Sequence, residues 1–133
     1  LDSIAWLAGT PYGNVPSFIA ANRASGVIVY LENVEMSPVD LVRALLSLRR
    51  HGWFDNLSGL VFGRSAGPSP TSPEGLSYVE ALRSVIGHLP CPILYDVDIG
   101  HQPPQVTLIN GAIAAFKFES GGGAVIHSPR DGV

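Results

Sequence analysis

The chain has 133 residues, which is enough for one domain with a single hydrophobic core. Hydrophobic residues make up 46% of it and charged residues only 14%, so we expect an apolar face that meets another domain or subunit. The net charge is −3 and no basic run exceeds Arg49-Arg50, which argues against a nucleic-acid partner.

Composition and hydropathy also bear on where the protein works. No apolar run approaches the roughly 20 residues that a membrane span needs, and no signal-peptide pattern is present. The single cysteine, Cys91, excludes an intramolecular disulfide. The chain opens at Leu1 without a methionine, in a pattern typical of the middle of a helix. We therefore expect a cytoplasmic protein whose natural start lies upstream, with no membrane partner.

The first quarter of the chain predicts a helical segment, a loop and a buried strand. Residues 1–8 carry apolar side chains at helical spacing, and Gly and Pro then break the pattern. Residues 14–25 are typical of a loop that holds at most a short amphipathic turn. Residues 26–32 form an apolar run opened by glycine, which predicts a strand buried on both faces with Glu32 at its carboxyl end.

A strand, a helix and a second strand follow one another with short links. Ser37 can cap a helix whose first residue is Pro38, and Asp40 stands three residues after the cap. Gly52 is placed to end this helix in a left-handed conformation. Residues 57–63 then predict a second buried strand. The unit is a right-handed βαβ crossover, so the two strands are expected to be parallel.

The next segment predicts a loop, a helix and a third parallel strand. Residues 64–71 are rich in Pro, Gly and Ser and show no periodicity. We expect the helix to restart at Ser72 and to end near Gly87, and residues 93–95 to form the strand.

The character of the chain then changes to antiparallel β structure. Asn110-Gly111 suits a type I′ turn between two strands, and a glycine-rich turn follows. The predicted strands of this three-stranded meander are 106–109, 112–118 and 124–127. The fold class is therefore α/β, a mixed sheet of parallel βαβ strands plus a C-terminal antiparallel meander. We expect one domain over 1–127 and a tail over 128–133.

Polar side chains follow each of the three predicted parallel strands. Glu32 follows the first strand, Arg64 the second and the loop 96–105 the third. Because parallel strands bring their carboxyl ends together, these residues are expected at the same edge of the sheet. Glu32 and His101 are therefore able to meet. A carboxylate bound to one imidazole nitrogen holds the ring in the tautomer that leaves the other nitrogen available as a base. This pair is two thirds of a nucleophilic triad.

The third member of such a triad is not evident in the sequence. The serines after the second strand lie in an irregular loop, and none stands in a Gly-x-Ser-x-Gly turn. These serines are Ser65, Ser69 and Ser72. Cys91 precedes its strand and so belongs to the opposite edge of the sheet. The sequence contains a base and an orienting acid with no nucleophile to activate.

Three alternatives stay open on the residues alone. Glu32 suits a solvated or helix-capping carboxylate, and His101 suits a turn histidine held by its own backbone. Asp96, Asp98 and His101 together offer oxygen and nitrogen ligands to a divalent cation, although one tight loop rarely completes a coordination sphere.

Four motifs resemble the C-terminal domain of the LD-carboxypeptidase family, which includes the microcin C self-immunity proteins. The resemblance runs from residue 1 to about 126. The motifs are Ala8-Gly9-Thr10-Pro11-Tyr12, Val29-Tyr30-Leu31-Glu32-Asn33, Gly59-Leu60-Val61-Phe62-Gly63-Arg64 and Gly100-His101-Gln102-Pro103-Pro104-Gln105. The resemblance implies a swivelling β/β/α domain. Relatives often carry Asp where this chain has Asn33, a departure that bears on substrate choice.

The resemblance also implies a serine hydrolase whose catalytic residues come from two domains. The family consists of serine hydrolases with a Ser-Glu-His triad, in which Glu32 would be the acid and His101 the general base. The nucleophilic serine, the oxyanion hole and most substrate contacts would come from an N-terminal domain absent from this chain. Arg64 is a candidate substrate-pocket residue. No metal or other cofactor is implied, and a homodimer stays open.

The implied function is hydrolysis of an amide bond in a murein tetrapeptide or in a peptidyl-nucleotide antibiotic. The chain by itself is then expected to be inactive. The alternative is a non-catalytic docking or dimerisation module that keeps the fold.

Overall fold

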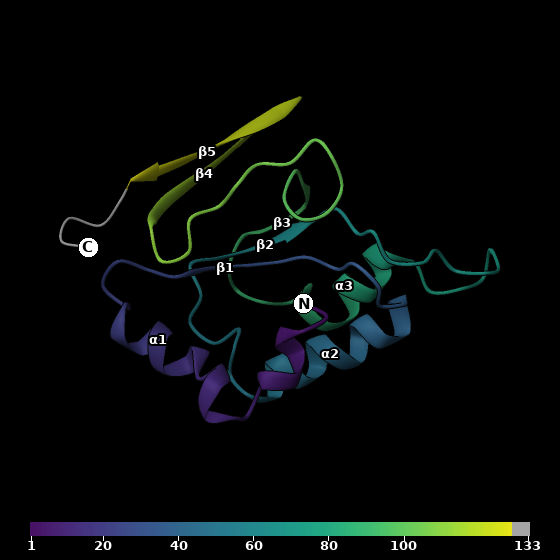
Figure 1. Ribbon diagram of the computed structural model, residues 1–133, viewed down its shortest axis with the longest axis horizontal. Helices are drawn as coiled ribbons and strands as arrows, with labels where there is room; N and C mark the ends of the chain where they lie inside the picture. The colour runs from purple at the N-terminus through teal and green to yellow at the C-terminus, as the bar shows by residue number, and fades with distance from the viewer. Residues whose placement is uncertain (129–133) are drawn as a thin grey trace.

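A three-stranded parallel sheet organises the computed structural model, which describes residues 1–128 (Figure 1). The strands lie in the order β1, β2, β3, so β2 is central. They are β1 (Ile28–Leu31), β2 (Gly59–Gly63) and β3 (Ile93–Val97). The helices α1 (Val15–Ala21), α2 (Pro38–Arg50) and α3 (Tyr78–Ile86) lie on one side of the sheet. The parallel βαβ arrangement predicted from the sequence is confirmed.

Helix α2 begins and ends where its sequence predicts. The Ser37 hydroxyl accepts a hydrogen bond from the Asp40 backbone nitrogen, and Pro38 occupies the first turn. Gly52 follows the helix with φ +75°, the left-handed conformation that glycine adopts at least cost. Leu41, Leu45 and Leu48 of this helix are fully buried in the core.

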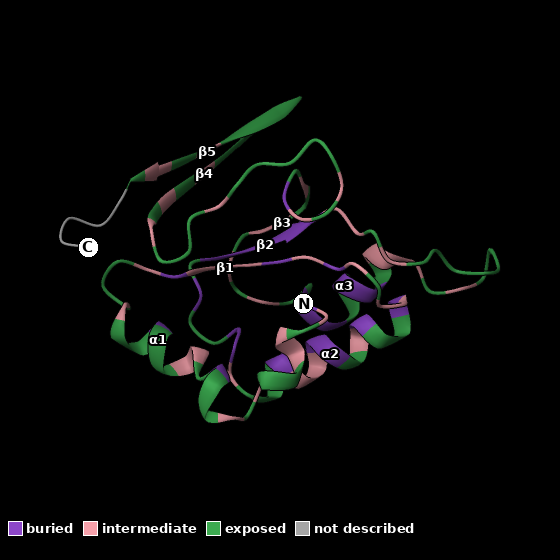
Figure 2. Ribbon diagram, viewed as in Figure 1, coloured by how far each residue is buried: buried purple, intermediate pink, exposed green. Residues whose placement is uncertain are grey.

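The core lies between the sheet and the helices. All five residues of β2 are buried, as expected for the central strand of a parallel sheet. Figure 2 shows buried residues along β2 and on the facing sides of α2 and α3. Trp53 and Phe54, which follow α2, are buried in the same cluster. This packing fixes the positions at which the three strands end.

Two helices differ from the sequence prediction. Residues 14–25 contain the two-turn helix α1, capped by the Asn14 side chain, where a loop with at most a short amphipathic turn was expected. Helix α3 begins at Tyr78 and not at Ser72. Ser77 caps it, and Glu80 reaches back to the Ser77 backbone, so the capping box is complete on both sides. This double hydrogen bond explains why the later serine starts the helix.

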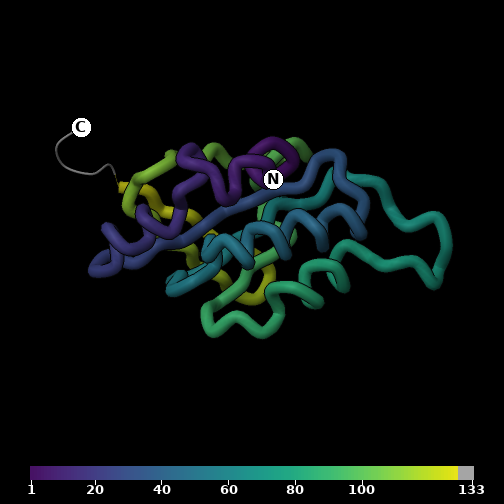
Figure 3. Tube along the Cα trace, turned by 90° about the horizontal axis from the view of Figure 1, so that it is seen from below, coloured from purple at the N-terminus to yellow at the C-terminus, as the bar shows by residue number. Residues whose placement is uncertain are grey.

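The N-terminal residues form shorter helical turns than the apolar spacing predicts. They are two 3₁₀ helices, η1 (Ile4–Leu7) and η2 (Pro11–Gly13). Viewed from below, these turns lie beside the helical layer (Figure 3). None of the helices within residues 1–128 has the length and hydropathy that a membrane crossing requires.

The antiparallel unit has two strands and forms a sheet of its own. They are β4 (Ile113–Glu119) and β5 (Gly122–Ser128), on the opposite side of the parallel sheet from the helices. The predicted strand at 106–109 is wrong, because its first residue, Val106, donates its backbone N–H to the carbonyl oxygen of Asp98 within the loop. Ser128 ends β5, and residues 129–133 of the expected tail lie outside the described part of the chain.

Candidate active site

The carboxyl ends of the parallel strands bring Glu32 and the loop after β3 to one place. Glu32 directly follows β1, and Leu31 is aligned with Phe62 near the end of β2. The end of β3 is aligned with Gly63, and the loop that follows it carries His101. Two residues far apart in the chain are therefore neighbours at the sheet edge, as expected for parallel strands.

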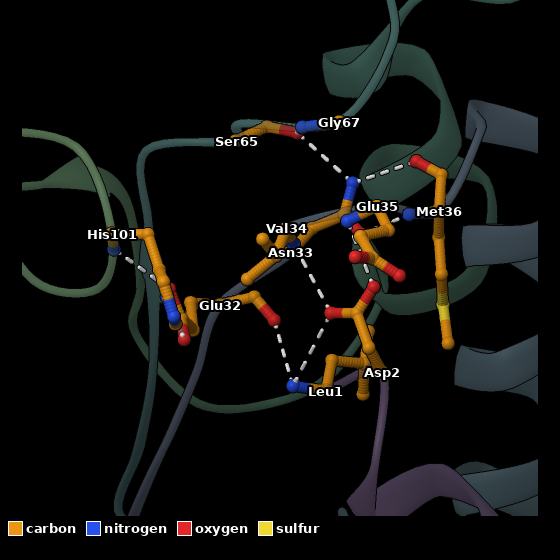
Figure 4. A network of polar contacts seen from close by, with 10 residues as sticks. All are labelled: Leu1, Asp2, Glu32, Asn33, Val34, Glu35, Met36, Ser65, Gly67 and His101. Carbon is orange, nitrogen blue, oxygen red and sulfur yellow. Dashed lines mark hydrogen bonds and ion pairs between the residues drawn. The ribbon is translucent and has the colours of Figure 1, made fainter.

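Glu32 holds His101 by both its ring and its backbone. The ring nitrogen Nδ1 lies 2.9 Å from Oε2 and 2.8 Å from Oε1 of the Glu32 carboxylate. The backbone nitrogen of His101 donates to Oε2 at 3.0 Å (Figure 4). The carboxylate is 25% exposed and the ring 64% exposed. Neither a solvated Glu32 nor a His101 held by its own backbone describes this arrangement.

The contact favours one tautomer of the imidazole. An ionised carboxylate only accepts hydrogen bonds, so the neutral ring carries its proton on Nδ1 and a lone pair on Nε2. Within residues 1–128, Nε2 of His101 has no hydrogen-bond partner. The ring is thus oriented with its basic nitrogen available to a group that approaches from outside.

The approach of the loop to Glu32 depends on Gly100. This residue has φ +99°, a conformation that L side chains rarely adopt. A Cβ at this position would overlap the Glu32 carboxylate. The glycine therefore allows His101 to place both its ring and its backbone against the same carboxyl group.

The segment on either side of Glu32 is held by Leu1 and Asp2. The Leu1 nitrogen donates to the Glu32 carbonyl oxygen at 2.8 Å. The Asp2 carboxylate accepts from the backbone nitrogens of Val34 and Glu35 at 3.1 and 2.9 Å (Figure 4). Burial alone would raise the pKa of Asp2, but these backbone hydrogen bonds together hold that pKa below its ordinary value. Asp2 is therefore ionised and fixes the turn after Glu32.

Asn33 links this turn to the loop after β2. It is only 2% exposed, and its amide group donates to the Met36 carbonyl oxygen and to the Ser65 hydroxyl. The Ser65 hydroxyl also accepts from the backbone nitrogen of Gly67. Ser65 is therefore occupied in holding the loop and does not face His101 (Figure 4).

No nucleophile within the described residues is in contact with the histidine. Ser69 and Ser72 are exposed in the loop before α3, and no serine, threonine or cysteine of residues 1–128 hydrogen-bonds to His101. Burial raises the pKa of the Cys91 thiol, which disfavours the reactive thiolate. Within residues 1–128, Glu32 and His101 are therefore in contact with each other, and no nucleophilic side chain is in contact with the histidine.

Arg64 follows β2 and faces the loop that carries His101. Its guanidinium donates to backbone carbonyl oxygens of that loop and lies 3.0 Å from the Asp98 carboxylate. Arg64 also lines a groove of about 500 Å³, together with Tyr78, Asp96 and Gln102. Burial, and then the charge of Asp96, raise the pKa of the Tyr78 hydroxyl, which donates to the Gly63 carbonyl oxygen.

The alternative metal site is not assembled. His101 is bound to Glu32, while Asp98 is paired with Arg64. Among residues 1–128, no group of three His, Cys, Asp or Glu side chains is arranged to hold a metal ion. Two of the three proposed ligands in the loop after β3 are thus bound to different partners, His101 to Glu32 and Asp98 to Arg64.

Sequence reasoning singled out Glu32, His101 and Arg64 but missed the residues that support them. Asp2, Asn33 and Gly100 carry these roles. A glycine directly before a histidine, after a strand end, is a signal for close backbone approach. The roles of Asp2 and Asn33 depend on which turns they reach in the folded chain, and no local pattern marks them.

Comparison with known proteins places the chain in context. A family model described as the LD-carboxypeptidase C-terminal domain matches residues 1–116. The crystal structure of muramoyltetrapeptide carboxypeptidase from Oxalobacter formigenes is similar to it, with a TM-score of 0.71 and 25% sequence identity. That match covers 92% of this chain and 40% of the carboxypeptidase, so the chain spans less than half of that protein. No match was found among curated proteins.

Proposed function

Because this chain belongs to the LD-carboxypeptidase C-terminal domain family, we propose that it supplies the acid and the base of a Ser-Glu-His triad in a longer serine hydrolase. Glu32 is the orienting acid and His101 the general base. The serine comes from a domain outside this chain, as the 40% coverage of the Oxalobacter formigenes carboxypeptidase suggests.

The observation that carries this proposal is the Glu32–His101 contact. A hydrogen bond of 2.8–2.9 Å from Nδ1 to a carboxylate, with Nε2 open, has the geometry that a triad base needs. A docking module has no need for this arrangement. The exposure of the ring fits a base that receives its nucleophile from another domain.

The reaction proceeds in two steps at this pair. His101 Nε2 takes the proton of the incoming serine as the serine oxygen attacks the amide carbonyl, and the carboxylate of Glu32 stabilises the imidazolium that forms. The imidazolium then gives its proton to the leaving amine, and an acyl-enzyme remains. Water, deprotonated by the same nitrogen, hydrolyses this ester and frees the serine.

We propose a murein tetrapeptide as the substrate. The similar protein from Oxalobacter formigenes is described as a muramoyltetrapeptide carboxypeptidase. The bond cleaved would be the amide between an L-centre and the C-terminal D-residue. A peptidyl-nucleotide antibiotic is the other amide substrate that the family resemblance allows, and the two are separated by direct assay.

The test is release of the D-residue from a murein tetrapeptide by the full-length protein. We expect hydrolysis that persists in a strong chelator, that is lost in His101→Ala, and that the 133-residue chain alone does not perform. His88→Ala is the matched control, since His88 lies after α3, away from the sheet edge. Full turnover in His101→Ala, or hydrolysis by the 133-residue chain alone, would overturn the proposal.

A further inference from the structure

The loop that carries His101 is attached to the sheet from two directions. On one side Glu32 binds the His101 ring and backbone. On the other side Arg64 binds the three residues that follow the histidine. Its Nη2 donates to the carbonyl oxygen of Gln102 at 2.8 Å and to that of Pro104, and its Nη1 donates to that of Pro103 at 3.3 Å.

Further contacts join the same two segments. The Gln102 side chain donates to the Ser65 carbonyl oxygen at 2.9 Å, next to Arg64 in the chain. The Arg64 guanidinium lies 3.0 Å from Asp98, so it also reaches the residues before the histidine. The backbone nitrogen of Arg64 donates to the Val97 carbonyl oxygen at the end of β3. Arg64 therefore spans the loop from its beginning to its end.

The chemistry of arginine suits this task better than that of lysine. A guanidinium is planar and presents five N–H donors in a fixed geometry, so one side chain can bind several carbonyl oxygens at once. Arg64 is rooted at the end of the fully buried strand β2 and its side chain is 27% exposed. A lysine ammonium is a single point of charge and cannot hold the same set of carbonyl oxygens in one geometry.

We propose that Arg64 is a positioning residue, which fixes the loop so that His101 stays against Glu32. This inference rests on the proposed function for its effect on turnover. It differs from the role expected from the sequence, in which Arg64 contacts substrate. The donor groups on both Nη atoms are directed at the protein's own carbonyl oxygens, although the side chain also borders the groove.

The kinetic test compares Arg64→Ala and Arg64→Lys in the full-length protein with a murein tetrapeptide as substrate. A positioning role predicts that Arg64→Ala lowers kcat by about 100-fold, the size of loss that a displacement of about 1 Å can cause. It predicts little change in KM and a smaller loss in Arg64→Lys. Arg43→Ala is the matched control, because Arg43 is exposed on α2 and, among residues 1–128, pairs only with Asp40.

A second readout does not depend on activity. In the ¹⁵N-histidine-labelled full-length protein, the Nδ1 proton of His101 should give a signal that disappears in Glu32→Gln. We expect the same signal to be broadened or lost in Arg64→Ala and to persist in Arg43→Ala. Asp98→Asn, which removes the ion pair and keeps the carbonyl contacts, should retain it. Should Arg64→Ala fail to fold, Arg64→Lys and Arg64→Gln serve in both assays.

The outcomes separate the two proposals. A raised KM with unchanged kcat would assign Arg64 to substrate binding and overturn the positioning role. An unchanged Nδ1 signal in a folded Arg64→Ala protein would also overturn it. If the wild-type protein hydrolyses no tetrapeptide, the proposed function fails, while the Nδ1 signal still decides whether Arg64 positions His101.

Discussion

At the scale of single residues, the site depends on how closely one loop approaches one carboxylate. Glu32 receives both the ring and the backbone nitrogen of His101, which requires the preceding residue to have no side chain. Asp2 and Asn33 hold the turn that follows Glu32. The position of the Glu32 carboxylate is therefore set by several contacts with the surrounding loops as well as by its own side-chain conformation.

A substitution at Gly100 tests this dependence. Gly100→Ala forces a Cβ onto the Glu32 carboxylate and also strains the backbone at φ +99°. We expect loss of the His101 Nδ1–carboxylate hydrogen bond, read from the same Nδ1 proton signal, and a loss of turnover of about 100-fold or more. Gly111→Ala is the matched control, since Gly111 also has positive φ (+75°) but has no neighbour within 4 Å of its Cβ.

The two glycine variants separate strain from displacement. Backbone strain should cost both variants about 1–2 kcal/mol of stability, and Gly100→Ala should lose more because its Cβ also overlaps Glu32. Only Gly100→Ala should disturb His101. Equal effects of the two substitutions on the Nδ1 signal would show that backbone strain alone, and not contact with Glu32, is responsible.

At the scale of elements, the helix start at Ser77 bears on the site. Tyr78 is the first residue of α3, and its hydroxyl donates to the Gly63 carbonyl oxygen, next to Arg64. The capping box of Ser77 and Glu80 therefore fixes a helix whose first turn supports the end of β2. A different helix start would place Tyr78 elsewhere.

We expect Ser77→Ala to lower the free energy of unfolding by about 1 kcal/mol, the usual cost of losing a serine N-cap. Hydrogen bonds from the Ser77 side chain and then its backbone hold the pKa of Glu80 below its ordinary value in the folded chain. A depressed folded pKa gives stability that is complete above the unfolded pKa, about 4.5, and that is lost as pH falls through the folded pKa.

Denaturant unfolding at several pH values measures both effects. The stability difference between wild type and Ser77→Ala should be constant near neutral pH and should shrink as the pH falls below about 4. Ser72→Ala is the control, because Ser72 lies before the helix and does not cap it. A larger loss of stability in Ser72→Ala than in Ser77→Ala would contradict the observed helix start.

The sequence predicted the elements whose signals are local. Strands β1 and β2 are continuous apolar runs. Helix α2 has a recognisable signal at each end, Ser37 and Pro38 at its start and Gly52 after its end. Two serines could have started α3. The helix begins after Ser77, which forms a complete capping box with Glu80, and not at Ser72. The strand expected at 106–109 does not form, because the Val106 backbone N–H donates to the Asp98 carbonyl oxygen within the loop. This hydrogen bond depends on the path of the whole segment, which no local pattern indicates.

The same distinction applies to the site. Glu32 and His101 were predictable from the rule that parallel strands bring their carboxyl ends together, and the structure places them in contact. Arg64 was predicted to lie at this edge, but most of its partners, apart from the Asp98 carboxylate, are backbone carbonyl oxygens of a loop. Backbone acceptors are common to every residue, so no sequence pattern can identify them.

At the scale of the whole molecule, the chain presents the exposed His101 ring, held by Glu32, together with exposed apolar side chains. Trp6 and Tyr12 are more than 80% exposed in the N-terminal turns, in line with the expectation of an apolar face that meets another domain or subunit. The chain also spans 40% of the Oxalobacter formigenes carboxypeptidase. The proposed enzyme is thus a longer protein in which this domain contributes Glu32 and His101.

The central claim is that these two residues act as one unit in hydrolysis. The most direct measurement is kcat for release of the D-residue from a murein tetrapeptide by the full-length protein carrying Glu32→Gln, His101→Ala or both. We predict that Glu32→Gln alone lowers kcat by about 10⁴-fold, as loss of the acid does in a Ser-His-Asp triad. In the His101→Ala background it should cost almost nothing further, because the carboxylate acts through the ring. Losses that simply multiply would contradict the claim.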